Sequence, residues 1–232
     1  MLRLAAVAAL MVGSVTAGRA GPVTGTVRFD GEPPARPVVK RDGDPRCAGD
    51  APSDDLVVTA GKVRDVLVRI KNGSLPAAPP PAPAVIDQRA CTYTPHVIGI
   101  VVGQKLSVRN SDGTFHNVHG TIGGTLAWNR PAAAGDPALA LDVPARAGDV
   151  VELACDVHPW MHAYAVVQDH AAFAVTGDDG AFALPGVPPG TYTLEAWHPV
   201  LGAKTMKITV GKAGATARFT YTARDVPPTS AR

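Results

Sequence analysis

Three side chains in the second half of the chain have the types and the spacing to bind one metal ion. Cys155, His158 and Met161 follow one another at intervals of three residues, with a proline directly after the histidine. A thiolate, two imidazoles and a weak axial thioether are the ligands of a mononuclear electron-transfer copper site. The motif lacks one imidazole, which His116 or His119 upstream can supply. The sequence therefore predicts a copper centre built from two segments.

His116 is the preferred upstream ligand because Asn117 follows it in the sequence. An asparagine side chain at this position can hydrogen-bond to the loop that carries Cys155 and hold the two ligand segments together. His119 stays open as the alternative. Strands must deliver both segments, and Pro159 is expected to stiffen the tight loop that carries the downstream ligands.

Two side chains beside the motif also bear on its chemistry. His162 follows Met161 directly, so it can compete for the metal ion or titrate near neutral pH. Trp160 is expected to shield the ion or to present a docking face, with ordinary packing as the competing interpretation. Three other histidines are interpreted as surface residues or hydrogen-bonded core residues: His96, His170 and His198.

The cysteine count supports the assignment of Cys155. The chain has three cysteines, and in an oxidising compartment cysteines pair, which leaves one over. Cys47 and Cys91 lie in turn-like or strand-edge contexts without nearby ligands, so they are the predicted disulfide. A metal would keep Cys155 as a bound thiolate. A buried free cysteine beside an incidental histidine is the competing interpretation.

The beginning of the chain predicts export. A short positive start, an apolar run from Leu4 to Ala17 and small residues that allow cleavage after Ala17 or Ala20 are typical of a secretory signal peptide, assigned to residues 1–20. The run is shorter than the roughly 20 residues of a membrane-spanning helix, and no later segment is predicted to span a membrane. We therefore expect a periplasmic or secreted protein.

The charge balance argues against one class of partner. Without Arg3 and Arg19 the chain has as many basic as acidic residues, 20 of each. A neutral chain without a basic block gives no electrostatic case for binding nucleic acid or an anionic membrane. No Ser-His-Asp arrangement, close carboxylate pair or phosphate-binding glycine loop is evident either, so we do not expect an enzyme.

The composition predicts short strands joined by turns. The chain holds 24 glycines and 22 prolines, and turn signals such as Asp-Gly and Pro-Pro-Gly separate its apolar runs. No stretch shows a helical face of convincing length, which favours an all-β protein made of sandwiches. The expected strands are Val23–Phe29, Leu56–Thr59, Val63–Ile70, His96–Val102, Lys105–Arg109, Ala138–Val143, Asp149–Ala154, Ala163–Val167, Ala172–Val175, Ala181–Leu184, Thr191–Trp197, Thr205–Val210 and Ala215–Thr222.

Residues 85–168 resemble a cupredoxin, a member of the blue copper group that includes plastocyanin and amicyanin. The resemblance rests on Phe115–His119, on the loop from Cys155 to Met161, and on segments 93–97 and 102–110, which are similar to the family's second and third strands. It implies a Greek-key β-sandwich with one type 1 copper site. The ligands carried over are His116, Cys155, His158 and Met161.

A second resemblance concerns the C-terminal part. Segments 173–182 and 187–194 resemble the carboxypeptidase regulatory-like domain, a small prealbumin-like β-sandwich. The stretch 171–222 is short for such a domain, and segments 25–31 and 65–70 resemble its opening strands.

These resemblances predict a nested organisation. A discontinuous sandwich, residues 22–75 plus 171–222, would enclose the cupredoxin-like domain in the sequence, with two domains in tandem as the alternative. The proline-rich stretch 76–84 is interpreted as a linker and residues 223–232 as a tail.

The expected function is single-electron transfer by a type 1 copper site between a donor protein and an acceptor protein. Electrons would pass through an exposed edge of His158. The alternatives are a periplasmic copper carrier or storage protein, and a structural or carbohydrate-binding β-sandwich protein.

Overall fold

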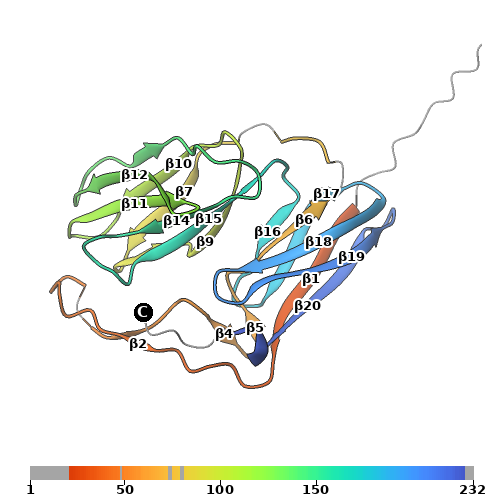
Figure 1. The fold of residues 1–232 in the computed structure, drawn as a ribbon, viewed down its shortest axis with the longest axis horizontal. Coiled ribbons are helices and arrows are strands. Elements are labelled where there is room, and N and C mark those ends of the chain that lie inside the picture. The colour runs from red at the N-terminus through yellow and green to blue at the C-terminus, as the bar shows by residue number, and fades with distance from the viewer. Residues whose placement is uncertain (1–20, 48, 73–74, 79–80, 228–232) are drawn as a thin grey trace, which may run out of the picture.

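Two β-sandwiches make up the described part of the chain (Figure 1). The computed structural model describes residues 21–47, 49–72, 75–78 and 81–227, so the predicted signal peptide lies outside the described residues. The predicted all-β class is confirmed: apart from one short 3₁₀ helix, η1 (Ala223–Asp225), the regular elements of the described residues are strands.

The central sandwich contains the candidate metal ligands. One of its sheets has the order β13 (Leu139–Leu141), β10 (Leu106–Asn110), β7 (Ala84–Arg89) and β8 (Thr92–Thr94). The other has the order β12 (Thr125–Ala132), β11 (His116–Ile122), β14 (Val150–Ala154), β15 (His162–Gln168) and β9 (Val97–Val101). Alternate side chains of these strands point inward and form one apolar core that includes Ile86, Leu106, Val118 and Leu153.

The flanking sandwich packs around a separate apolar core that includes Val27, Phe182 and Leu194. One sheet has the order β17 (Ala181–Val187), β1 (Gly21–Asp30), β5 (Lys62–Val63) and β4 (Val58–Thr59), and β20 (Ala215–Thr222) also pairs with β1. The other has the order β16 (Phe173–Val175), β6 (Leu67–Asn72), β18 (Gly190–His198) and β19 (Gly202–Val210).

Strands from both ends of the described chain share the sheets of the flanking sandwich. Strand β1 pairs with β17 and β20, and β6 pairs with β16 and β18. The flanking sandwich therefore takes strands from before and after the central sandwich in the sequence. The domain boundaries named above stay a prediction.

A small apolar cluster joins the two sandwiches. Leu67 on β6 packs with Val97 on β9 and Val166 on β15, and Phe173 and Trp197 border them. We call this cluster the junction.

An extended segment leaves the flanking sandwich and runs along the central one (Figure 1). This covering segment, residues 31–57 with residue 48 outside the description, contains the short paired strands β2 (Val38–Val39) and β3 (Ala51–Pro52). The predicted disulfide is present, and it ties Cys47 of the segment to Cys91 in the turn between β7 and β8. The disulfide thereby holds the covering segment against the turn between β7 and β8.

Some predicted elements differ from the observed ones. The expected strand Val63–Ile70 is broken into β5 and β6, because Asp65 takes a φ of 61° that a strand does not allow. Strand β12 is not among the expected strands; it includes Pro131 and lies at a sheet edge, where proline is tolerated. The predicted tail begins with η1, which Thr222 caps through a bond from the Arg224 backbone N–H.

Candidate metal centre

A β-hairpin loop presents the three downstream side chains. Strands β14 and β15 pair antiparallel, with Ala154 opposite His162, so residues 155–161 form the loop between them. Two backbone hydrogen bonds close it: Cys155 N donates to Met161 O at 3.1 Å, and Met161 N donates to His158 O at 2.8 Å. The loop therefore has a defined shape that brings its potential ligands to one side.

The pairing of β11 with β14 brings His116 to the same place. His119 pairs with Ala154, so the start of β11 runs beside the hairpin loop. Alternation along the strand places His116 and Val118 on the inner face, and both are fully buried. His119 faces the other way.

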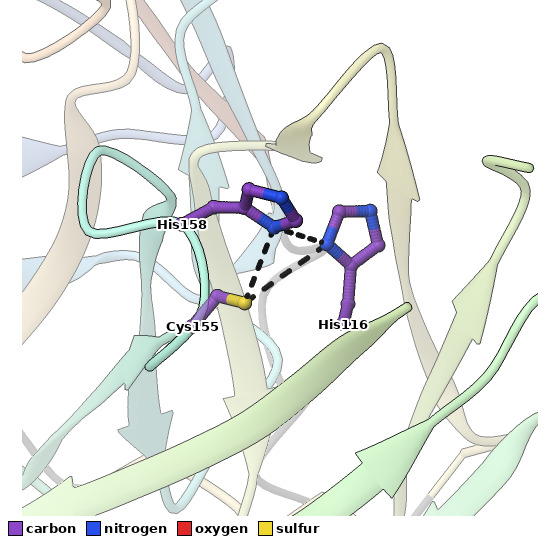
Figure 2. Close-up of side chains that lie close together, drawn as sticks. All are labelled: His116, Cys155 and His158. Atoms are coloured by element: carbon purple, nitrogen blue, oxygen red, sulfur yellow. Dashed lines mark hydrogen bonds between the residues drawn. The ribbon is translucent and has the colours of Figure 1, made fainter. Parts of the chain in front are cut away.

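The decisive geometry is the convergence of three ligand atoms (Figure 2). Cys155 Sγ lies 3.9 Å from His116 Nδ1 and 3.7 Å from His158 Nδ1. The two Nδ1 atoms are 2.9 Å apart. All three side chains are at most 2% exposed. Strand β11 and a hairpin loop distant from it in the sequence thus bring one thiol and two imidazoles together in the interior.

The size of this triangle fits a metal ion. A point equidistant from three atoms with these separations lies about 2.1 Å from each, and bonds from imidazole nitrogen or thiolate sulfur to a first-row metal are about 2.0–2.3 Å long. A single ion can therefore bind all three atoms with little movement of the side chains.

Carboxylates hold the outer nitrogen of each histidine. His116 Nε2 donates to Asp112 at 3.0 Å, and His158 Nε2 donates to Asp44 of the covering segment at 3.2 Å. A proton on Nε2 leaves the Nδ1 lone pair free to bind a metal, and such carboxylates raise the basicity of ligand histidines. The Thr114 hydroxyl and the Arg46 backbone N–H hold the pKa of Asp44 below its usual range, which keeps this acceptor ionised.

The facing Nδ1 atoms of His116 and His158 are suited to bind a cation. Two Nδ1 lone pairs that face each other repel unless a proton or a metal ion lies between them. Burial lowers the pKa of His116, although the Asp112 carboxylate acts in the opposite direction. The neutral imidazole that results is the metal-binding form.

Asn117 connects the two ligand segments. Its side-chain amide donates to Asp156 Oδ2 at 2.8 Å, and its Oδ1 accepts the Asp156 backbone N–H at 2.7 Å. The Tyr93 hydroxyl lies 3.0 Å from Asn117 O and 2.9 Å from Ala154 O, so it joins β11 to β14 beneath the site. These bonds fix the separation of His116 from the hairpin loop.

Trp160 and Met161 lie in the same loop as Cys155 and His158. The Trp160 ring lies 5.1 Å from that of His158, centroid to centroid, and its Nε1 donates to Cys91 O at 3.0 Å. Trp160 thus packs over the candidate ligand. Met161 is 1% exposed and belongs to the apolar core that contains Cys155.

The two alternative ligands lie outside the cluster. His119 Nδ1 is 2.7 Å from Asp156 Oδ1 near the surface, and His162 Nε2 contacts Asp55 of the covering segment. The expectation of an exposed His158 edge is wrong. Its side chain is 1% exposed, because Asp44 and Cys47 cover its Nε2 edge, with Cys47 Sγ at 3.6 Å.

The sequence reasoning missed the carboxylates and the tyrosine that support the site. Asp112 lies within the Ser-Asp-Gly turn signal, residues 111–113, just before His116, so its nearness in sequence is a usable hint. Asp44 and Tyr93 offered no such signal, since the fold alone brings them to the ligands.

Comparisons with known proteins show a likeness that covers only part of this chain. Solved structures similar to this chain include cupredoxins. A purple cupredoxin from Nitrosopumilus maritimus is 24% identical, with 37% of this chain and 99% of that chain covered and a TM-score of 0.32. The Cu(I) form of an amicyanin M51A mutant is 20% identical, with coverages of 44% and 98% and a TM-score of 0.33. A copper-containing nitrite reductase from Thermus scotoductus SA-01 is 18% identical, with coverages of 43% and 25% and a TM-score of 0.33.

One family model also matches part of the chain. Residues 147–219 match a model described as polysaccharide lyase family 4, domain II. The match begins in the central sandwich and ends in the flanking one. No curated protein matches this chain. In the part of the chain that the structure describes, no helix has the length and apolar character needed to cross a membrane.

Proposed function

We propose that this protein is an exported type 1 copper protein that carries single electrons between redox partners. The observation that supports this most is the buried triangle of Cys155 Sγ, His116 Nδ1 and His158 Nδ1, whose size fits one ion. Met161 is proposed as the weak axial ligand, since it lies at the end of the same closed loop.

The residues around the triangle favour a site that changes little between redox states. Copper bound there would supply the one-electron couple between Cu(I) and Cu(II). Asn117 and Tyr93 hold the two ligand segments at a fixed separation, and Asp112 and Asp44 fix the orientation of the imidazoles. A preorganised cluster of this kind keeps its geometry without further ordering.

Apolar side chains beside the ligands offer a surface to a partner. Phe115 and Val157 immediately precede the two histidine ligands and are 46% and 50% exposed. Because the covering segment buries His158, a partner would approach the loop through these side chains or through the segment itself. Exposed apolar residues near a redox centre suit a transient protein contact.

The first prediction tests the thiolate. Wild-type protein titrated with Cu²⁺ should develop intense visible thiolate-to-copper absorption, and Cys155→Ser should abolish it because the sulfur ligand is lost. His119→Ala is the matched control, since His119 lies outside the cluster, and it should keep the colour. A colourless Cu²⁺ complex of the wild-type protein would contradict the proposal, and failure to bind copper would leave a structural role.

Copper carriage or storage is the second candidate. Burial of His158 beneath Asp44 and Cys47 favours it, because that edge is closed to a partner. The two candidates differ in kinetics. An electron carrier should exchange electrons with a small redox protein faster than it loses Cu(I) to a chelator, whereas a carrier or store of copper should show the reverse order.

A further inference from the structure

A second cluster of metal-binding side chains lies near the junction, outside the triangle. It consists of Asp55 from the covering segment, His96 just before β9, and His162 at the start of β15. One ligand atom from each residue lies within 4.8 Å of the others. The His96 and His162 rings are 5.4 Å apart, centroid to centroid, and inclined by 68°.

His96 is buried in an unusual state. It is 4% exposed, and neither of its ring nitrogens has a hydrogen-bond partner among the described residues. His170 is also buried, yet its Nε2 lies 2.9 Å from Ile70 O and its Nδ1 accepts the Ala172 N–H at 3.2 Å. Buried polar groups are normally paired, so an unpaired imidazole such as that of His96 is a candidate ligand for an ion.

The other two members are already arranged as ligands. His162 Nε2 contacts Asp55 Oδ1, where a proton joins the two groups and a divalent ion can replace it. The Ser53 hydroxyl donates to Asp55 Oδ2 at 2.8 Å and accepts the Asp55 backbone N–H at 3.1 Å. This reciprocal pair orients the carboxylate, as the supporting groups of metal sites do.

The electrostatic surroundings also favour a cation. The negative charges of Asp54, Asp65 and Asp55 attract a positive charge at His96. Arg64 offsets the charge of Asp65 through a 3.0 Å ion pair. His198 also faces this region, but its Nδ1 accepts backbone N–H groups of Val200 and Leu201. Its Nε2 therefore carries the proton, which excludes His198 as a ligand.

We propose that Asp55, His96 and His162 form a second metal site, for a divalent first-row ion such as Zn²⁺ or Cu²⁺. Two imidazoles and one carboxylate, without sulfur, suit these ions and leave coordination positions open. Ligands of a tetrahedral ion with bonds of about 2.0–2.1 Å lie about 3.3 Å apart, so the cluster would tighten on binding. The site is independent of the triangle and would give no thiolate absorption.

The test uses full-length protein whose first site is removed by Cys155→Ser and His116→Ala. Equilibrium dialysis with Zn²⁺ and metal analysis should give one ion per chain. Adding His96→Phe or Asp55→Asn should raise the Kd for Zn²⁺ by roughly tenfold or more. Adding His119→Ala is the control and should change neither stoichiometry nor affinity, because His119 belongs to neither cluster.

Folding is checked separately. His96→Phe replaces an unpaired buried ring with an apolar one, so the metal-free variant should unfold at the same urea concentration or a higher one. Asp55 is about half exposed, so Asp55→Asn gives a variant with little risk to folding. Unchanged Zn²⁺ affinity in both variants, or no Zn²⁺ bound by the parent, would overturn the second site and leave the copper proposal untouched.

Discussion

Each candidate histidine ligand depends on a carboxylate from a different part of the chain. Asp112 lies four residues before His116 and also accepts the backbone N–H groups of Ala90 and Cys91, at 2.7 and 2.9 Å. Asp44 reaches His158 from the covering segment. The histidine orientations are therefore set by groups that also anchor the turn and the segment joined by the disulfide.

Replacing Asp112 by asparagine should weaken metal binding. The neutral amide can still accept one backbone N–H, but it no longer polarises His116 Nε2, so the Nδ1 atom becomes a poorer donor. We expect the copper affinity to fall by roughly 10- to 100-fold, measured by competition with a chelator. Asp142→Asn is the control, since Asp142 pairs with Lys105 at the surface. Equal affinities in the two variants would exclude this role.

At this scale the sequence predicts what is local. The spacing of Cys155, His158 and Met161 is a property of one loop, so it could be read directly. The pairing of Asp55 with His162, and the burial of His96 without partners, depend on the covering segment and on the parallel pairing of β9 with β15. Such long-range contacts leave no pattern in a single sequence.

Among the elements, the covering segment most changes the predicted site. It contacts the candidate metal-binding loop through Asp44 at His158, and the start of β15 through Asp55 at His162. Arg41 donates to Ala90 O at 3.2 Å, and the disulfide from Cys47 closes a sequence separation of 44 residues. The covering segment therefore lies over His158, and the disulfide holds it in this position.

Removing the disulfide should loosen the covering segment. Cys47→Ser combined with Cys91→Ser should lower the free energy of unfolding by about 2–4 kcal/mol, because the unfolded chain gains freedom. Trypsin should then cut faster after Lys40, Arg41 and Arg46, which lie in the segment. The measurements are urea unfolding and mass spectrometry of the fragments. Cys155→Ser keeps the disulfide and is the control; the same cleavage rate in both would show that other contacts hold the segment.

Strand prediction succeeded where alternation is strong and failed where backbone geometry intervenes. Strand β14 matches the expected Asp149–Ala154 within one residue. Asp65 breaks an apolar run because it adopts a positive φ, which an apolar pattern does not reveal. The covering segment has few apolar residues and short strands, so its path over the central sandwich could not be inferred.

For the whole molecule, polar contacts accompany the apolar junction between the sandwiches. Arg69 of β6 donates to Glu195 at 2.8 Å and to Gln168, at the end of β15, at 3.4 Å. Gly99 of β9 lies so close to Phe173 that an added Cβ would be 2.3 Å from its ring. The two sandwiches are therefore fitted to each other, and the imidazoles of His96 and His198 near the junction are buried.

The burial of His198 predicts a pH dependence of stability. Burial lowers the pKa of His198 to about 3, against about 6.5 in the unfolded chain. The folded state therefore keeps His198 neutral while the unfolded state takes up a proton. The resulting stability is complete above pH 6.5 and is lost as the pH falls from about 6.5 toward 3. Between pH 7.5 and 5 the metal-free protein should lose about 2 kcal/mol through this group.

His198→Asn isolates the contribution. The asparagine oxygen can accept the Val200 and Leu201 N–H groups that Nδ1 accepts now, but it does not titrate. Urea unfolding at pH 7.5 and 5 should therefore show a smaller stability loss in the variant. Some loss should remain, because burial also lowers the pKa of His96. The range above pH 5 avoids the ordinary titration of carboxylates. An equal loss in wild type and variant would mean that His198 is protonated inside the folded protein, and that the junction is open to water.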